Sequence, residues 1–211
     1  MTKLEIIGLS GKAGAGKDYI FDNYLRPMGY HRWALADHFK IWIVGKEQAT
    51  YEEVFKTKPA HIRKLLQVAG TKEGRDVFGE DVWCQTTRAW MTHLSNTMGI
   101  NKFCVTDVRF PNEVKFITES GGQVYRIEAP QRVKNSPLSP EARQHISETA
   151  LNGYVDFSGF LWNDPQYEET IKQQIYNLMG LGPIPVDPFD QTFGQMIERF
   201  ADQTIKLMRG K

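Results

Sequence analysis

The chain has 211 residues, of which 41% are hydrophobic and 24% charged, values typical of a folded domain and not of a disordered protein. Its 26 Lys and Arg balance 25 Asp and Glu to a net charge of +1, which argues against broad electrostatic binding of nucleic acid or of an anionic membrane. Two cysteines are too few for a disulfide framework, and no stretch approaches 18 apolar residues, so disulfide-rich secreted and membrane-spanning classes are excluded. The N-terminal apolar run is too short for a signal peptide, and we expect a reducing, cytoplasmic compartment.

The first half of the chain alternates short apolar runs with amphipathic segments. Residues 3–9 predict a buried parallel strand that ends at a glycine-rich turn, and a helix follows up to Pro27. A second strand is expected at 32–36. Amphipathic helices are predicted over 59–74, where a proline stands at the start, and over 79–98.

The second half continues the alternation. The expected elements are a strand at 103–107, a helix at 111–120, strands at 123–128 and 155–162, and two C-terminal helices carrying Tyr167 to Leu178 and Phe193 to Ala201. Between the strands 123–128 and 155–162, the proline-containing and basic segment 130–145 predicts a mobile polar loop. Strands that alternate with helices predict an α/β fold with a mostly parallel sheet.

One glycine-rich segment carries a chemical signature. Residues 11–18, GKAGAGKD, match seven of the eight positions of the phosphate-binding loop G-x-x-x-x-G-K-[ST], and they lie between a predicted strand and a predicted helix. Glycines let successive N–H groups surround phosphate oxygens, and the helix N-terminus adds partial positive charge. Lys17 is expected to stabilise charge on the β- and γ-phosphates during transfer. The predicted ATP-binding residues of the loop are Gly11, Lys12, Ala13, Gly14, Ala15, Gly16, Lys17 and Asp18.

Asp18 departs from the common motif, which has Ser or Thr at this position to hold magnesium. A carboxylate can also bind magnesium, directly or through water. The alternative for Asp18 is a carboxylate that only favours the helix dipole.

Several further segments resemble the bacteriophage deoxynucleoside monophosphate kinase family. Besides the phosphate loop, they are LADHFK (35–40), RKLLQVAGT (63–71), EDVW (80–83), TDVRFPNE (106–113), HISETAL (145–151) and Trp162-Asn163-Asp164. The resemblance covers residues 3 to about 180 and implies a P-loop kinase fold: a five-stranded parallel sheet flanked by helices, with an acceptor-binding helical insertion and a lid. It implies one kinase domain over 1–211, with the insertion at about 37–98, the lid at about 130–145 and a C-terminal helical extension at about 182–211.

Two residues at the end of the strand 103–107 are the first candidates beyond the loop. Asp107 is expected to orient magnesium or water, with a helix cap or an ion pair with Arg109 as the alternative. Arg109 is expected to grip the acceptor phosphate with its planar guanidinium, with an ion pair to Glu113 as the alternative. The metal candidates are Asp18 and Asp107.

The remaining candidates belong to the acceptor site and the lid. Trp83 is a candidate for stacking on a nucleobase, with burial in the core as the alternative, and Arg132 is a candidate for closing over the transferring phosphoryl group. In part through the resemblance, the substrate-binding set is Asp37, Lys40, Arg63, Gln67, Gly70, Thr71, Trp83, Asp107, Arg109, Glu113, His145 and Glu148; Asn163 joins the ATP site, and the catalytic set is Lys17, Arg109 and Arg132.

The function that these residues favour is ATP-dependent phosphorylation of deoxynucleoside monophosphates to diphosphates, with ATP and Mg²⁺ as cofactors. A phosphomevalonate kinase-like small-molecule kinase is the nearest alternative, and DVRFPNE favours the nucleotide enzyme. A non-catalytic nucleotide-binding regulatory module is the alternative from another class. The expected partners are small-molecule nucleotides, with neither nucleic acid nor membrane; a homodimer is compatible with the sequence. The expected compartment is the cytoplasm, that of the host if the chain is phage-encoded.

Overall fold

The computed structural model describes residues 3–136 and 138–181. The chain divides into two compact units, Met1–Ile171 and Lys172–Lys211. The first contains the sheet and every residue discussed below. Of the second, the description covers most of helix α10 (Ile171–Leu178) and the residues up to Leu181. The predicted helix at 193–201 and the extension from 182 lie outside the described residues.

The first unit is built on a parallel sheet in which the described residues form five strands in the order β2-β3-β1-β4-β5. The strands are β1 (Glu5–Ser10), β2 (His31–Trp33), β3 (Lys102–Val108), β4 (Gln123–Glu128) and β5 (Gly159–Trp162). Ile7 of β1 lies opposite Cys104 on one side and Gln123 on the other. Strands β1, β3 and β4 are almost entirely buried, which explains their continuous apolar runs. The predicted α/β fold class is confirmed.

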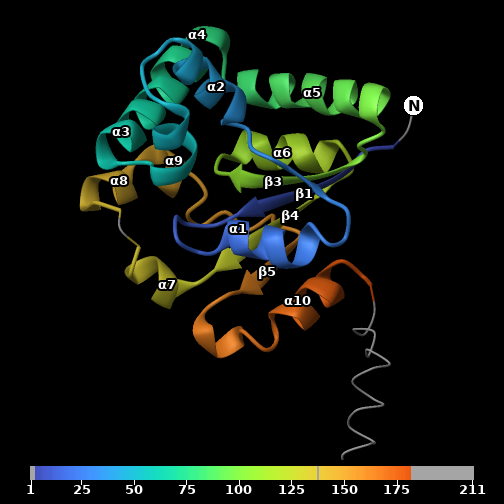
Figure 1. Ribbon diagram of the computed structural model, residues 1–211. Helices are drawn as coiled ribbons and strands as arrows, with labels where there is room; N and C mark the ends of the chain where they lie inside the picture. The colour runs from blue at the N-terminus through green and yellow to red at the C-terminus, as the bar shows by residue number, and fades with distance from the viewer. Residues whose placement is uncertain (1–2, 137, 182–211) are drawn as a thin grey trace, which may run out of the picture. The chain divides into compact units, whose positions relative to one another are not determined.

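Helices cover the sheet on both faces (Figure 1). Their bounds in the first unit are α1 (Lys17–Ile20), α2 (Asp37–Gly45), α3 (Ala60–Val68), α4 (Asp76–Phe78), α5 (Val82–Met98), α6 (Pro111–Glu119), α7 (Pro130–Lys134), α8 (Pro140–Gln144) and α9 (Ile146–Thr149). Wider π-helical turns follow at Phe21–Leu25, Glu53–Thr57 and Ala69–Arg75, and a 3₁₀ turn at Pro165–Tyr167. Among the described residues, no helix is both long and apolar enough to cross a bilayer.

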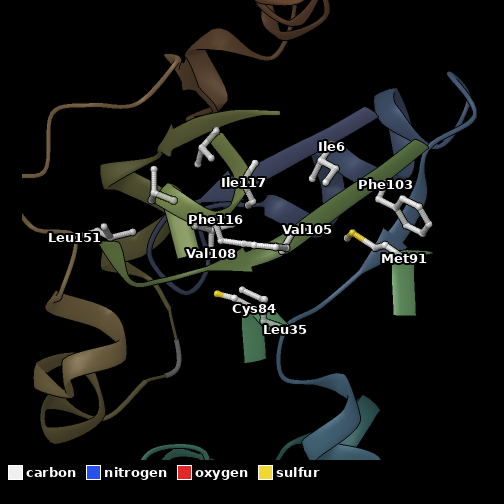
Figure 2. Packing of buried hydrophobic residues seen from close by; sticks show 12 residues of the cluster. Ile6, Leu35, Cys84, Met91, Phe103, Val105, Val108, Phe116, Ile117 and Leu151 are labelled. Atoms are coloured by element: carbon white, nitrogen blue, oxygen red, sulfur yellow. The ribbon is translucent and has the colours of Figure 1, made fainter. Parts of the chain in front are cut away.

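The main core lies between the sheet and helices α5 and α6 (Figure 2). Met91 of α5 and Ile117 of α6 are fully buried against Phe103 and Val105 of β3. Gly8 of β1 permits this close approach, because a Cβ there would lie 2.7 Å from Ile117 Cδ1. The opposite face is covered by α1 and the turn after it (Figure 1), where Phe21 is buried.

A second, smaller core holds the helical segment 37–98 together. Phe39 and Ile43 of α2 pack with Val54 and with Ile62 of α3, and Trp83 contacts both cores. The two cores therefore share one aromatic side chain, which fixes this segment against the edge of the sheet.

Four sequence predictions need correction. The second strand ends at Trp33 rather than at 36, because the N–H groups of Leu35 and Ala36 donate to Asp107 and not to a neighbouring strand. The helix expected over 59–74 is α-helical only to Val68 and then widens into a π-helix, where Gly74 lies directly against the Trp83 ring.

The last strand is shorter than predicted and begins at Gly159. Just before it, Ser158 donates its main-chain N–H to the oxygen of Val124 and accepts the N–H of Val124 at Oγ, the position that a main-chain oxygen would take in a regular ladder. The segment 130–145 is not a plain loop but contains α7 and α8, each with a proline in its first turn. Asp164 accepts the N–H groups of Gln131 and Arg132 and thereby fixes the start of α7.

Candidate functional site

The glycine-rich segment forms a loop between β1 and α1, as predicted, with residues 11–16 in the loop and Lys17 and Asp18 in the first turn of α1. Gly14 and Gly16 both have φ of 88°, a left-handed conformation that other residues rarely adopt. Gly16 also has no room for a side chain, because an added Cβ would collide with the amide of Asn163. Asn163 is buried and donates from Nδ2 to the main-chain oxygen of Ala15 over 2.8 Å. The structure thus places Asn163 behind the loop, as a support for its backbone.

Lys17 is the partly buried basic residue at the end of the loop. Its Nζ donates to the main-chain oxygens of Gly11 and Lys12 over 2.7 and 3.0 Å. Burial lowers the pKa of Lys17 to about 7; the positive charge of Arg109 adds to this effect, and the carboxylates of Glu148 and Asp18 oppose it. A phosphate beside Lys17 would supply the negative charge that restores the ammonium form.

The loop opens into a cavity of about 410 Å³ at the carboxyl ends of the strands, where ligands bind in parallel α/β sheets. Among the described residues, seven Lys and Arg side chains line it against four Asp and Glu. The cations are Lys17, Arg32, Lys40, Lys58, Arg63, Arg75 and Arg109, and the acids are Asp18, Asp107, Glu113 and Glu148. A cavity with this excess of positive charge suits anionic ligands such as phosphorylated molecules.

Most of the predicted substrate-binding residues line this one cavity. From the helical segment these are Lys40, Arg63, Gln67, Gly70, Thr71 and Trp83, and from the strand ends and the α9 region Asp107, Arg109, Glu113, His145 and Glu148. Asp37 is not among the lining residues; it forms ion pairs with Lys40 (2.6 Å) and Arg32 (3.3 Å). Arg32, Lys58 and Arg75 also line the cavity, although no sequence motif marks them.

Asp18 and Asp107 line the same cavity as Lys17. The Asp18 side chain is 70% exposed, with Oδ1 3.5 Å from Arg32 Nε. Asp107 accepts the N–H groups of Leu35 and Ala36 over 2.8 and 3.1 Å, so neither alternative considered for it, a cap of the helix at Pro111 or an ion pair with Arg109, is found.

The two carboxylates fit a magnesium ion bound together with a nucleotide. Magnesium is commonly held by one or two carboxylates plus phosphate oxygens and waters, and not by a cage of protein ligands alone. No cluster of three or more His, Cys, Asp or Glu suited to a metal occurs in the part of the chain that the structure describes.

Arg109 and Glu148 form an ion pair beside the phosphate loop. Arg109 also donates to the main-chain oxygen of Ser147 over 3.2 Å, and Glu148 Oε2 accepts the N–H of Ala13 over 3.1 Å. Burial pushes the pKa of Glu148 upward, but Arg109, the N–H of Ala13 and Lys17 outweigh it and hold that pKa below its ordinary value. Glu148 is therefore an anion within the reach of the loop.

Glu113 pairs with Arg75 and not with the Arg109 guanidinium. Its carboxylate also accepts the main-chain N–H groups of Arg109 (2.6 Å) and Phe110 (3.1 Å). The Arg75 guanidinium lies 3.8 Å from the centroid of the Phe110 ring. Burial raises the pKa of Glu113, while Arg75 and the two N–H groups counteract it. The pair forms a fixed part of the cavity wall, and it leaves the Arg109 guanidinium free of Glu113.

Trp83 is partly buried against both cores and also borders the cavity. Its Nε1 donates to the main-chain oxygen of Gly70 over 3.2 Å, and its ring packs near-parallel to His38 and against Phe39. The surface that remains for a ligand is therefore the part of the ring not covered by these neighbours.

The lid candidate Arg132 does not line the cavity. Its main-chain N–H donates to Asp164 over 3.1 Å, and its Nε is buried without a hydrogen-bond partner. Arg143 of the same segment donates to the main-chain oxygens of Val133, Ser136 and Leu138. From the segment 130–144, Leu138 is the cavity-lining residue among those described.

Comparison with known proteins agrees with this fold. The chain is 26% identical over 188 residues to a protein of Acanthamoeba polyphaga mimivirus described as "Putative deoxynucleotide monophosphate kinase", a match that spans 81% of this chain and 94% of that protein. No protein-family model matches the chain.

Solved structures share the architecture at low sequence identity. The Thermus thermophilus protein TT1252 superimposes with a TM-score of 0.54 at 19% identity, over 86% of this chain and 100% of that chain. A sugar kinase from a Janibacter species superimposes with a TM-score of 0.51 at 12% identity, over 86% and 97%. Together with the parallel sheet and the phosphate loop, these similarities show that the chain has a P-loop kinase fold.

Proposed function

We propose that the protein transfers the γ-phosphoryl group of ATP to a deoxynucleoside monophosphate. The observation that carries this proposal is that the phosphate loop with Lys17 and the basic residues Arg63, Lys40 and Arg109 line one cavity. A donor phosphate and an acceptor phosphate bound there would lie next to each other. The mimivirus relative supports the substrate class through its name, at 26% identity.

The residues of the cavity divide into two tasks. The N–H groups of the loop and Lys17 bind the β- and γ-phosphates and stabilise the charge that develops as the bond to the leaving ADP breaks. Arg63, Lys40 and Arg109 orient the acceptor phosphate, whose ionised oxygen forms the new bond to phosphorus. Because that oxygen carries no proton at neutral pH, the reaction needs positioning more than a general base.

Magnesium bound with ATP would neutralise part of the phosphate charge, and Asp18 and Asp107 are the residues that would hold it.

A coupled assay of ADP release tests the proposal, with the four common deoxynucleoside monophosphates, their ribose counterparts and phosphomevalonate as acceptors. We expect turnover with one or more deoxynucleoside monophosphates. Turnover with phosphomevalonate alone would assign the cavity to a different kinase, and nucleotide binding without turnover of any acceptor would favour the regulatory module.

The matched variants are Lys17→Ala and Lys64→Ala. Lys17→Ala should lower the rate by about 10²- to 10³-fold, because Lys17 stabilises the transition state. Lys64 is exposed on α3 and does not line the cavity, so Lys64→Ala should leave the rate unchanged. A Lys17→Ala protein that keeps more than about a tenth of the wild-type rate contradicts the proposed role of the loop.

A further inference from the structure

The carboxylate of Glu148 is bound to the phosphate loop itself. It accepts the N–H of Ala13 over 3.1 Å and pairs with Arg109. Its side chain is 6% exposed. Ala13, Arg109 and Lys17 all line the cavity, and they are the kinds of donors that bind phosphate oxygens.

We propose that Glu148 occupies an anion position of the phosphate loop when no nucleotide is bound, and that a polyphosphate has to displace it. A carboxylate and a phosphate oxygen of the polyphosphate compete for the same N–H of Ala13. The two anions also repel each other at close range, where burial weakens solvent screening.

The backbone that carries Glu148 is held in place independently of this carboxylate. Lys12 Nζ donates to the main-chain oxygen of Glu148 and, over 2.5 Å, to Oδ1 of Asn152. His145 accepts the N–H of Ser147 at the start of α9. Displacement therefore requires a rotation of one side chain while its main chain stays anchored to the loop.

Displacement has a consequence for the acceptor side of the cavity. Arg109 is paired with Glu148, so a polyphosphate that removes the carboxylate releases the guanidinium for the acceptor phosphate. Glu148 thereby keeps Arg109 paired until the loop is filled. This inference rests on the proposed function, since it takes the loop to be a polyphosphate site.

Titration calorimetry with inorganic tripolyphosphate, without metal or acceptor, tests the inference. Glu148→Gln retains the shape of the side chain but removes its charge. We expect it to bind tripolyphosphate about tenfold more tightly than the wild type. A carboxylate that fills the position about 90% of the time leaves about a tenth of the wild-type protein ready to bind, which weakens the apparent affinity by about tenfold. Glu141→Gln is the control for the loss of one negative charge, because Glu141 is exposed on the neighbouring helix α8. It should bind tripolyphosphate with the affinity of the wild type.

Glu148→Asp provides a second variant, because it keeps the charge but shortens the reach to Ala13. It should bind tripolyphosphate more tightly than the wild type, though less tightly than Glu148→Gln. Equal affinities of the wild type, Glu148→Gln and Glu148→Asp would overturn the inference and leave the proposed function standing. Failure of every protein to bind tripolyphosphate would overturn both.

Discussion

Arg75 and Glu113 form an ion pair in the wall of the cavity, although 37 residues separate them in the sequence. Their side chains are only 10% and 4% exposed. Glu113 uses its second oxygen to accept the N–H groups of Arg109 and Phe110. One buried carboxylate thus connects the π-helical turn before α4 with the chain that leaves β3 toward α6.

Glu113→Gln should destabilise the protein by about 3–5 kcal/mol, because it leaves the guanidinium of Arg75 buried without its counter-ion. The free energy of unfolding in urea measures this. Glu119→Gln, on the same helix but in the exposed pair with Lys115, should cost no more than about 1 kcal/mol. Equal losses in the two variants would show that the Arg75 pair contributes no more than a surface contact.

Arg109→Ala should weaken binding of the acceptor monophosphate more than binding of ATP. The guanidinium lies beyond the end of β3 and is not held by Glu113, so it can turn to an acceptor phosphate. Dissociation constants for both nucleotides decide this, with Arg109→Lys as the matched variant that keeps the charge but loses the planar fork. A loss for ATP as large as that for the monophosphate would place Arg109 at the donor phosphates.

Asp18→Asn should bind metal-free ATP at least as tightly as the wild type, yet require more magnesium for half-maximal rate. The carboxylate repels the triphosphate but attracts the cation, so metal and nucleotide binding are coupled through its charge. Magnesium titrations at fixed ATP measure the shift. Asp22→Asn, which removes another exposed carboxylate from the turn after α1, is the control. Superimposable activation curves for all three proteins would place Asp18 outside the reach of the metal.

Nucleotide binding above neutral pH should take up protons at Lys17. Burial lowers the pKa of Lys17 to about 7, so without a bound phosphate its amine should be mostly neutral at pH 8.5. Bound phosphates favour the ammonium form, and binding should therefore take up as much as about one proton and weaken as pH rises above 7. Calorimetry in two buffers of different ionisation enthalpy counts these protons. If nucleotide binding to Lys17→Met takes up the same number of protons as binding to the wild type, the uptake belongs to another group.

The phosphate loop and the class of fold could be predicted from the sequence because both depend on neighbouring residues. The loop needs glycines at fixed spacing before Lys17, and the buried strands need short apolar runs. Because these requirements involve residues that follow one another in the sequence, the bounds of β4 and the start of α6 at Pro111 agree with the prediction. The predicted end of the second strand was wrong because the N–H of Leu35 donates to the carboxylate of Asp107, which is distant in the sequence, and not to a neighbouring strand.

Only the tertiary structure decided which charges meet. Glu148 accepts the N–H of Ala13 although the two residues are 135 positions apart in the sequence. Glu113 forms its ion pair with Arg75 and not with Arg109, which is nearer in the sequence. Long side chains extend several ångströms from their backbone, and the parallel sheet brings the ends of distant strands to one edge. Sequence spacing therefore identifies the residues that can carry charge at this edge, whereas their partners follow from burial and geometry in the folded chain.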